Sequence, residues 1–130
     1  MPIFKDSNQL ISLLKELWET IFEDNDVVEQ IRKSNLTVFT VLHDPEASIW
    51  VGPGIVITGE EAKSEAVIRL ELTGDTAHDI YLKKVNLATA LGTGKVKVKG
   101  PAMKLIQMVP LLKNVYREYP RLCEKYNIPT

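Results

Sequence analysis

The chain has 130 residues, which is enough for one domain with a single hydrophobic core and too few for two. Its formal net charge of -1 gives it no overall field that would attract nucleic acid or an anionic membrane. The only cysteine excludes an intramolecular disulfide and any zinc site built on several cysteines, and it fits a reducing compartment.

The first predicted element is an amphipathic helix that ends near residue 22. Apolar side chains recur at helical spacing from Leu10 onward, and Asp6 with Gln9 three positions later resembles a capping box. The charged side chains fall on the opposite face, where we interpret them as solvated. A second, shorter helical stretch is expected at residues 27–33.

Strand patterns replace the helical pattern after this second stretch. Residues 36–43 are rich in β-branched and aromatic side chains, and Asp44-Pro45 ends them with a turn signal. Two shorter strands are predicted at residues 49–51 and 55–58, because Gly-Pro-Gly separates two apolar runs. Strands joined by such short turns are expected to pair in antiparallel fashion.

A fourth strand and a third helical region come next. In residues 66–73, apolar side chains alternate with Arg69 and Glu71, which predicts one dry face and one wet face. A helical region follows directly, with Asp75 or Thr76 as its cap.

The most informative segment covers residues 83–112. It places a short apolar helix at 87–91, a strand at 95–99 in which lysine alternates with valine, and a long apolar helix in direct succession. No catalytic group falls inside it. A hydrophobic helix laid over a small sheet is a way to build an apolar cavity, so the segment indicates binding of an apolar ligand more than bond chemistry.

The last predicted helix begins at Pro101 and contains Pro110. A proline inside a helix removes one backbone donor and clashes with the preceding turn, so we expect the helix to kink or restart there. Helices gathered at the two ends of the sequence can cover only one face of the sheet. We therefore predict an α+β fold with a five-stranded, mainly antiparallel sheet covered on one face by helices.

The sequence resembles the sterol carrier protein type 2 family of lipid-binding domains. The likeness is carried by GTGKVKVKG at residues 92–100 feeding an apolar terminal helix, by the strand with Trp50, and by the alternating strand AVIRLELT. The order of elements matches from the first helix to about Tyr119. The resemblance implies an apolar tunnel between sheet and helices that binds sterols, fatty acids or acyl-CoA. It implies no catalytic residue, metal site or cofactor.

Three features depart from the family pattern. Lys83-Lys84 stands where relatives often have a Gly-Lys turn, Pro101 replaces a polar or acidic residue, and Pro110 interrupts the helix that would line the tunnel. These departures leave the shape of the cavity and the identity of the ligand open. The sequence shows no secretory signal, no span of roughly 20 apolar residues and no Ser-Lys-Leu peroxisomal signal at its end. We therefore expect a stand-alone microbial, cytoplasmic member of the family, with one lipid-binding domain over residues 1–130.

The candidate tunnel residues are apolar side chains on the predicted dry strand faces and on the later helices. Each of them is equally readable as plain core. They are Phe39, Val41, Leu70, Leu82, Leu87, Leu91, Met103, Ile106, Met108, Leu112 and Tyr116. Two of them are methionines, whose flexible thioethers adapt to ligands of varying shape.

The polar candidates are weaker. His43 and His78 each lack a second ligand at metal spacing, so no metal site is predicted. His78 beside Asp79 resembles a general base, but adjacent helical residues point in different directions, so His78 is interpreted as a surface residue. Cys123 would need a nearby histidine to act as a nucleophile. The lysines of residues 95–99 either protect the outer face or edge of the sheet, or hold the phosphates of coenzyme A or of anionic head groups.

We therefore expect a non-enzymatic protein that binds, and transfers or presents, a lipid such as a fatty acid, an acyl-CoA or a sterol-like molecule. Its partners would be that ligand and, transiently, a membrane or an enzyme, and no nucleic acid. Residues 119–122 are a candidate mobile gate to the tunnel. The alternative is an accessory protein-interaction module with a filled core.

Overall fold

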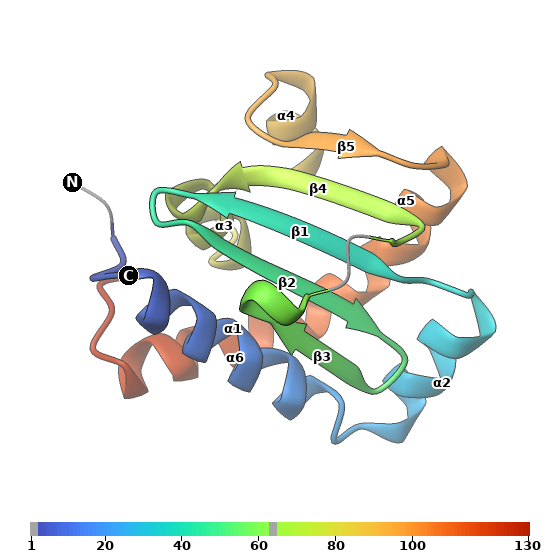
Figure 1. Cartoon of the computed structure of the whole chain (residues 1–130), viewed down its shortest axis with the longest axis horizontal. Coiled ribbons are helices and arrows are strands. Elements are labelled where there is room, and N and C mark those ends of the chain that lie inside the picture. Colours follow the sequence, from blue (N-terminus) through green and yellow to red (C-terminus); the bar gives the residue numbers. More distant parts are fainter. Residues whose placement is uncertain (1–2, 63–64) are drawn as a thin grey trace.

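The computed structural model describes residues 3–62 and 65–130, which form a five-stranded sheet with helices on one of its faces (Figure 1). The helices are α1 (Ser7–Ile21), α2 (Asn25–Lys33), α3 (Gly74–Tyr81), α4 (Leu87–Gly92), α5 (Ala102–Met108) and α6 (Leu112–Lys125). The strands are β1 (Val38–His43), β2 (Ala47–Gly52), β3 (Ile55–Thr58), β4 (Ile68–Thr73) and β5 (Lys97–Lys99), and two 3₁₀ turns are η1 (Gly59–Glu61) and η2 (Val109–Leu111). Within the described ranges, no helix is long and apolar enough to cross a membrane.

The strands lie in the order β3-β2-β1-β4-β5. All neighbours pair antiparallel except β1 and β4, which run parallel with Phe39 opposite Arg69. The parallel pair arises because the chain returns after β3, through η1, to the end of the sheet at which β1 begins. The prediction of an α+β fold with a mainly antiparallel five-stranded sheet is confirmed. A rule based on short turns does not reveal the one parallel pair, because the connection that makes it is long.

The strand register decides which side chains share a face of the sheet. Alternation places Val38, Thr40 and Leu42 of β1 on the helix-covered face, together with Leu70 of β4. Phe39 lies on the other face. There it is 7% exposed, beside Trp50 of β2 and with the Arg69 guanidinium 5.3 Å from its ring centroid.

Trp50 also lies on the face away from the helices. Its indole Nε1 donates a hydrogen bond to the Glu65 carbonyl oxygen at 2.9 Å, so the segment that leads into β4 lies over this face. Trp50 is buried as a result, at 7% exposure. The outer face of the sheet is therefore partly closed by its own aromatic side chains and by this connection.

Helix α1 has the cap and the apolar face that its sequence predicts. The Asp6 carboxylate accepts a hydrogen bond from the Gln9 backbone N–H at 2.8 Å, and the Gln9 side chain accepts one from the Lys5 N–H at 2.7 Å. The buried side of the helix consists of Leu10, Leu13, Leu14, Leu17 and Ile21. This side packs against α6 and against β2 and β3.

The N-cap of helix α3 lies two or three residues earlier than predicted. Thr73, not Asp75 or Thr76, is its N-cap, and the Thr73 hydroxyl accepts a hydrogen bond from the Thr76 N–H at 3.1 Å. Asp75 instead accepts a hydrogen bond from the Ile3 N–H at 2.9 Å. Its carboxylate therefore ties the N-terminal segment to α3.

The long C-terminal helix restarts at Pro110, as the sequence predicts. Helix α5 ends at Met108, one 3₁₀ turn contains Pro110, and α6 continues from Leu112. This break matters for the site, because α5 and α6 can then lie at different angles to the sheet (Figure 1).

Candidate functional site

An apolar cavity lies between the helix-covered face of the sheet and the helices. Its volume is about 70 Å³. The lining consists of Trp18, Ile31, Leu36, Val38, Thr40, Ile49, Val51, Leu70, Leu72, Ile80, Tyr81, Leu87, Val96, Met108, Leu111, Leu112 and Val115. None of these described lining residues carries a carboxylate, an imidazole or a cationic group.

The one titratable side chain in the cavity lining is that of Tyr81. Burial raises the pKa of Tyr81 to about 12, so its hydroxyl is neutral at physiological pH. The cavity therefore offers dispersion contacts and two hydroxyls, from Thr40 and Tyr81, and no group suited to general acid or base catalysis.

An open groove of about 310 Å³ adjoins the cavity on the side of α4 and α5. It is lined by Asn86, Leu87, Ala88, Leu91, Leu105, Ile106, Val109, Leu112 and Tyr116. Leu87 and Leu112 line both the cavity and the groove, so these two side chains form the wall between them. Ligand pockets span roughly 300–1,000 Å³, and the cavity alone falls well below that range.

A lysine side chain lies beside the groove. The Lys83 ammonium lies 4.9 Å from the ring centroid of Tyr116, which is itself a groove residue. Lys83 has φ 64°, the left-handed conformation that glycine adopts most readily. The turn after α3 thus keeps a glycine-like backbone while it presents a positive charge at the edge of the groove.

The structure brings seven of the eleven candidate tunnel residues to the cavity or the groove. Leu70 and Met108 line the cavity, and Leu87 and Leu112 line both hollows. The groove contains Leu91, Ile106 and Tyr116. Whether these side chains contact a lipid stays a prediction.

The other four candidates lie elsewhere. Phe39 and Val41 belong to the opposite face of the sheet, because their register partners in β4 are Arg69 and Glu71. Leu82 is half-buried and packs against the core beside α3, and Met103 is 66% exposed on α5. The expectation that Phe39 and Val41 face the same space as Leu70 is wrong for this structure.

Sequence reasoning missed several residues of the cavity. Val38 and Thr40 lie on the dry face of β1, in register with Ile68 and Leu70. In residues 36–43 both the odd and the even positions carry large apolar side chains, so neither set stood out as the dry face. Strand β4 shows its dry face clearly, because its apolar residues alternate with Arg69 and Glu71. That face identifies the dry residues of β1 only once the pairing of β4 with β1 is known.

The proposed gate at residues 119–122 is contradicted by the structure. These residues lie inside α6, where Tyr119 is 0% exposed and Leu122 is 7% exposed. Pro120 is accommodated within the helix. A segment held in the core in this way is unsuited to open and close.

His78 is buried, at 1% exposure, which corrects its interpretation as a surface residue. Its Nε2 lies 2.8 Å from the Pro129 carbonyl oxygen, which can only accept, so Nε2 carries the hydrogen. Nδ1 then accepts from the Tyr119 hydroxyl at 2.7 Å. Burial lowers the pKa of His78, so the imidazole is neutral, and it fastens the C-terminal end of the chain to α3 and α6.

Cys123 is also buried, and burial raises the pKa of its thiol. A raised thiol pKa is the opposite of what a catalytic cysteine requires. The Cys123 side chain therefore belongs to the core.

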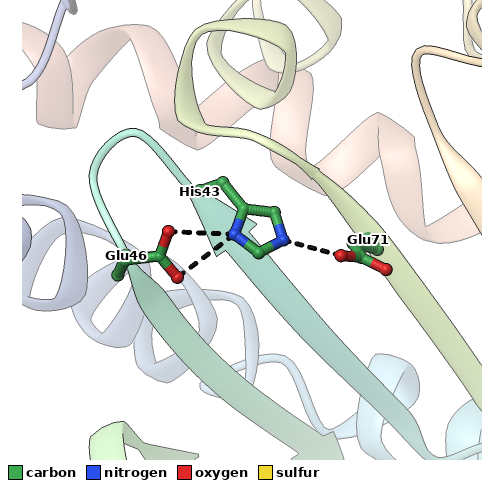
Figure 2. Close-up of polar contacts among 3 residues, drawn as sticks. All are labelled: His43, Glu46 and Glu71. Carbon is green, nitrogen blue, oxygen red and sulfur yellow. Dashed lines mark hydrogen bonds and ion pairs between the residues drawn. The ribbon is translucent and has the colours of Figure 1, made fainter.

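His43 forms a cluster with two carboxylates at the end of β1 (Figure 2). Its Nδ1 lies 2.9 Å and 3.1 Å from the two carboxylate oxygens of Glu46, and its Nε2 lies 2.7 Å from an oxygen of Glu71. The hydrogen bond to Glu46 raises the pKa of His43 most, and the hydrogen bond to Glu71 raises it further. The cluster lies on the outer face of the sheet, away from the cavity. Both imidazole nitrogens are within hydrogen-bond distance of a carboxylate, so the three side chains form an ion-pair cluster. No group of three metal-binding side chains is found within residues 3–62 and 65–130.

Comparisons with known proteins give a likeness in structure. No protein-family model matches the chain, and no curated protein matches it. Sterol Carrier Protein 2 from Yarrowia lipolytica, in its apo form, is similar with a TM-score of 0.67 and 24% identity, over 89% of this chain and 98% of that chain.

Two further solved structures agree with this likeness. The sterol carrier protein domain 2 of Helicoverpa armigera has a TM-score of 0.65 and 16% identity, over 84% of this chain and 89% of that chain. The UbiJ-SCP2 ubiquinone synthesis protein has a TM-score of 0.59 and 15% identity, over 88% of this chain and 95% of that chain. The chain thus has the sterol carrier protein 2 fold, as the resemblance in its sequence predicts.

Proposed function

We propose that this protein is a non-enzymatic lipid carrier that holds the apolar part of its ligand in the groove and the cavity together. The observation that carries the proposal is that the two apolar hollows share Leu87 and Leu112 as a common wall. A modest movement of these side chains joins the hollows into one space. An acyl chain can then enter from the groove and end against β1 and β4.

The energetics allow such binding without any special polar contact. Burial of one methylene contributes about 0.8 kcal/mol, so a 16-carbon chain contributes on the order of 10 kcal/mol before the cost of association. Micromolar affinity needs about 8 kcal/mol net. The cost of opening the wall and ordering the chain therefore places the expected affinity near this level or weaker.

A polar head group would remain near the mouth of the groove. Lys83 supplies a positive charge there, beside Tyr116, and this arrangement favours a carboxylate or phosphate over an uncharged head. The proposal is therefore a fatty acid or acyl-CoA in preference to a sterol. The buried thiol of Cys123 fits a cytoplasmic location, where thiols stay reduced.

The sizes of the hollows leave one competing function. The cavity of about 70 Å³ is small. In the competing function the core is filled by its own side chains, and the protein acts as an accessory interaction module. In that case the groove would be a surface feature without a ligand.

Two measurements on the purified protein separate these functions. The first extracts the denatured protein with organic solvent and identifies any lipid by mass spectrometry. The second titrates a fluorescent fatty acid and competes it with unlabelled fatty acid, acyl-CoA and sterol. Stoichiometric lipid or saturable, competed binding supports the carrier. Protein that carries no lipid and binds none of the three ligands would leave the accessory module as the function.

A further inference from the structure

We propose that the protein docks on the anionic surface of a lipid bilayer through α4, β5 and α5. The first observation is an uneven distribution of charge. Residues 80–117, here called the cationic segment, contain eight of the 16 lysines and arginines and none of the 17 aspartates and glutamates. This segment carries +8 and the rest of the chain -9, so the net charge of -1 conceals a strong separation of charge.

Seven of the eight cationic side chains of this segment are lysines, and the eighth, Arg117, forms an ion pair with Glu118 just beyond the segment. Among residues 3–62 and 65–130, no lysine of this segment forms an ion pair with a carboxylate. Lys84 and Lys104 bond to backbone carbonyl oxygens, and Lys97 lies beside Glu71 in the sheet register. Lys83, Lys95, Lys99 and Lys113 remain exposed.

Apolar side chains on the same segment protrude into solvent. Met103, Ile106 and Val109 are 66%, 63% and 53% exposed, and they recur every three residues along α5 and into η2. In the part of the chain that the structure describes, Ile55 is the only other large hydrophobic side chain exposed in this way. Three exposed apolar side chains accompanied by lysines and no carboxylate match an interface that inserts between anionic lipids.

The position of the groove favours a bilayer over other partners. Ile106 and Val109 line the groove as well as protruding from α5, so the surface that would enter the lipid is also the mouth of the site. Figure 1 shows α4, β5 and the start of α5 along the β5 edge of the sheet, away from α1. A lipid would then pass from the membrane into the groove without crossing water.

Helix α1 does not offer a comparable surface, although it is amphipathic. Its apolar side is buried against the sheet and α6. Its charged residues are Lys15, Glu16 and Glu19, so it has no excess of positive charge that would attract an anionic membrane. The docking surface therefore lies at the opposite part of the fold.

The test is sedimentation of the full chain with lipid vesicles of phosphatidylcholine alone and of phosphatidylcholine mixed with phosphatidylserine. We expect binding to the mixed vesicles that weakens as salt is added. Lys95→Glu with Lys99→Glu should weaken it by more than tenfold, because each lysine near an anionic surface contributes about fivefold. Met103→Glu should weaken it as well.

Matched variants elsewhere on the surface serve as controls. Lys5→Glu with Lys15→Glu makes the same change of charge outside the cationic segment, and Ile55→Glu makes the same kind of change at the other exposed hydrophobic residue. Both should bind vesicles as the unmodified protein does. Equal losses in the control and test variants would overturn the docking surface.

This inference deepens the proposed carrier function, so the two are measured separately. Each variant is also titrated with a fluorescent fatty acid in the absence of vesicles. Fatty-acid binding without any vesicle binding would overturn the docking surface and leave the carrier function standing. Vesicle binding without fatty-acid binding would support the docking surface and overturn the carrier function. Self-association abolished by Met103→Glu, with no vesicle binding, would assign the face to a second copy of the chain.

Discussion

The two histidines of the chain have opposite environments. His43 is 39% exposed and lies between two carboxylates, which raise its pKa. His78 is buried and bonded to Tyr119 and the Pro129 carbonyl oxygen, and burial lowers its pKa. Their protonation therefore affects folding stability in opposite directions.

The free energy of unfolding should show these opposite signs between about pH 5.5 and 7.5. The His43 contribution is present below about pH 6.5, the unfolded pKa, and is lost as pH rises through its raised folded pKa. The His78 contribution is full above about pH 6.5 and is lost as pH falls toward its lowered folded pKa. Urea unfolding of His43→Gln should thus give stability that rises with pH, and that of His78→Gln stability that falls with pH.

The pH dependence of each variant reports the histidine that remains. In His78→Gln that is His43, which is partly exposed and whose ion pairs are screened by solvent, so the slope is shallow. The slope for His43→Gln, which reports the buried His78, should therefore be the steeper of the two. The unmodified protein should lie between the variants. Slopes of the same sign in both variants would show that other groups control stability in this range.

Leu87→Trp should weaken fatty-acid binding by about tenfold or more, because a larger side chain in the shared wall obstructs the passage between groove and cavity. Leu82→Trp is the matched control, since Leu82 is a half-buried leucine that lines neither hollow. Fluorescence titration measures both, with thermal unfolding as a check on the fold. Equal affinities in the two folded variants would place the passage elsewhere.

Residue-level prediction from the sequence succeeded where polarity alternates and failed where it does not. The alternation with Arg69 and Glu71 identified Leu70 correctly as a residue of the dry face. In β1 both parities are apolar, and Phe39 was assigned to the wrong face. His78 was misplaced because its partners come from α6 and the C-terminal end, and local sequence does not reveal that contact.

At the scale of elements, one glycine fixes the connection from β5 to α5. Gly100 has φ 139°, and a Cβ there would lie 2.5 Å from the Val67 carbonyl oxygen. Side chains are excluded at this position for both reasons. The closing glycine of GTGKVKVKG therefore has a steric origin, and it sets the direction in which α5 leaves the sheet.

Gly100→Ala should destabilise the fold by about 2–4 kcal/mol, from the strained backbone and the clash with Val67. Gly92→Ala is the control within the same motif, because a Cβ at Gly92 meets nothing within 4 Å and the residue is helical. That control should change stability by no more than about 1 kcal/mol. Chemical denaturation compares them, and similar losses in both would contradict the steric explanation.

Most elements were predictable because their signals are local. The cap of α1, the strands and the restart at Pro110 all depend on residues within a few positions of one another. The predicted cap of α3 lies two or three residues after the observed one, because Asp75 and Thr76 are residue types that cap as well as Thr73 does. Only the fold shows that Asp75 bonds to Ile3 instead.

At the scale of the whole molecule, the groove and the most deeply buried part of the core are formed by different elements. Helix α1, α6 and the strands β1 and β2 hold the buried core, whereas α4 and α5 carry the groove and have few buried residues. Low local burial allows local opening without global unfolding. The size of the cavity depends on how the helices pack on the sheet, and the sequence does not reveal it. The net charge of -1 indicated no partner because it conceals the separation of charge along the chain.

Hydrogen exchange should localise the response to ligand. A fatty acid at about 100 times its dissociation constant stabilises the folded state by about 2.7 kcal/mol. The largest gain in protection is expected in α4 and α5, which border the groove, with smaller gains in α1 and β2. A gain that is largest in α1 would place the ligand away from the groove.

The two tryptophans lie on opposite sides of the sheet. Trp18 lines the cavity, whereas Trp50 is held on the outer face by its bond to Glu65. The protein therefore contains its own pair of optical probes, one inside the site and one outside it. In a Trp50→Phe variant the remaining emission should respond to a bound fatty acid, and in a Trp18→Phe variant it should not, so ligand occupancy can be followed without any label.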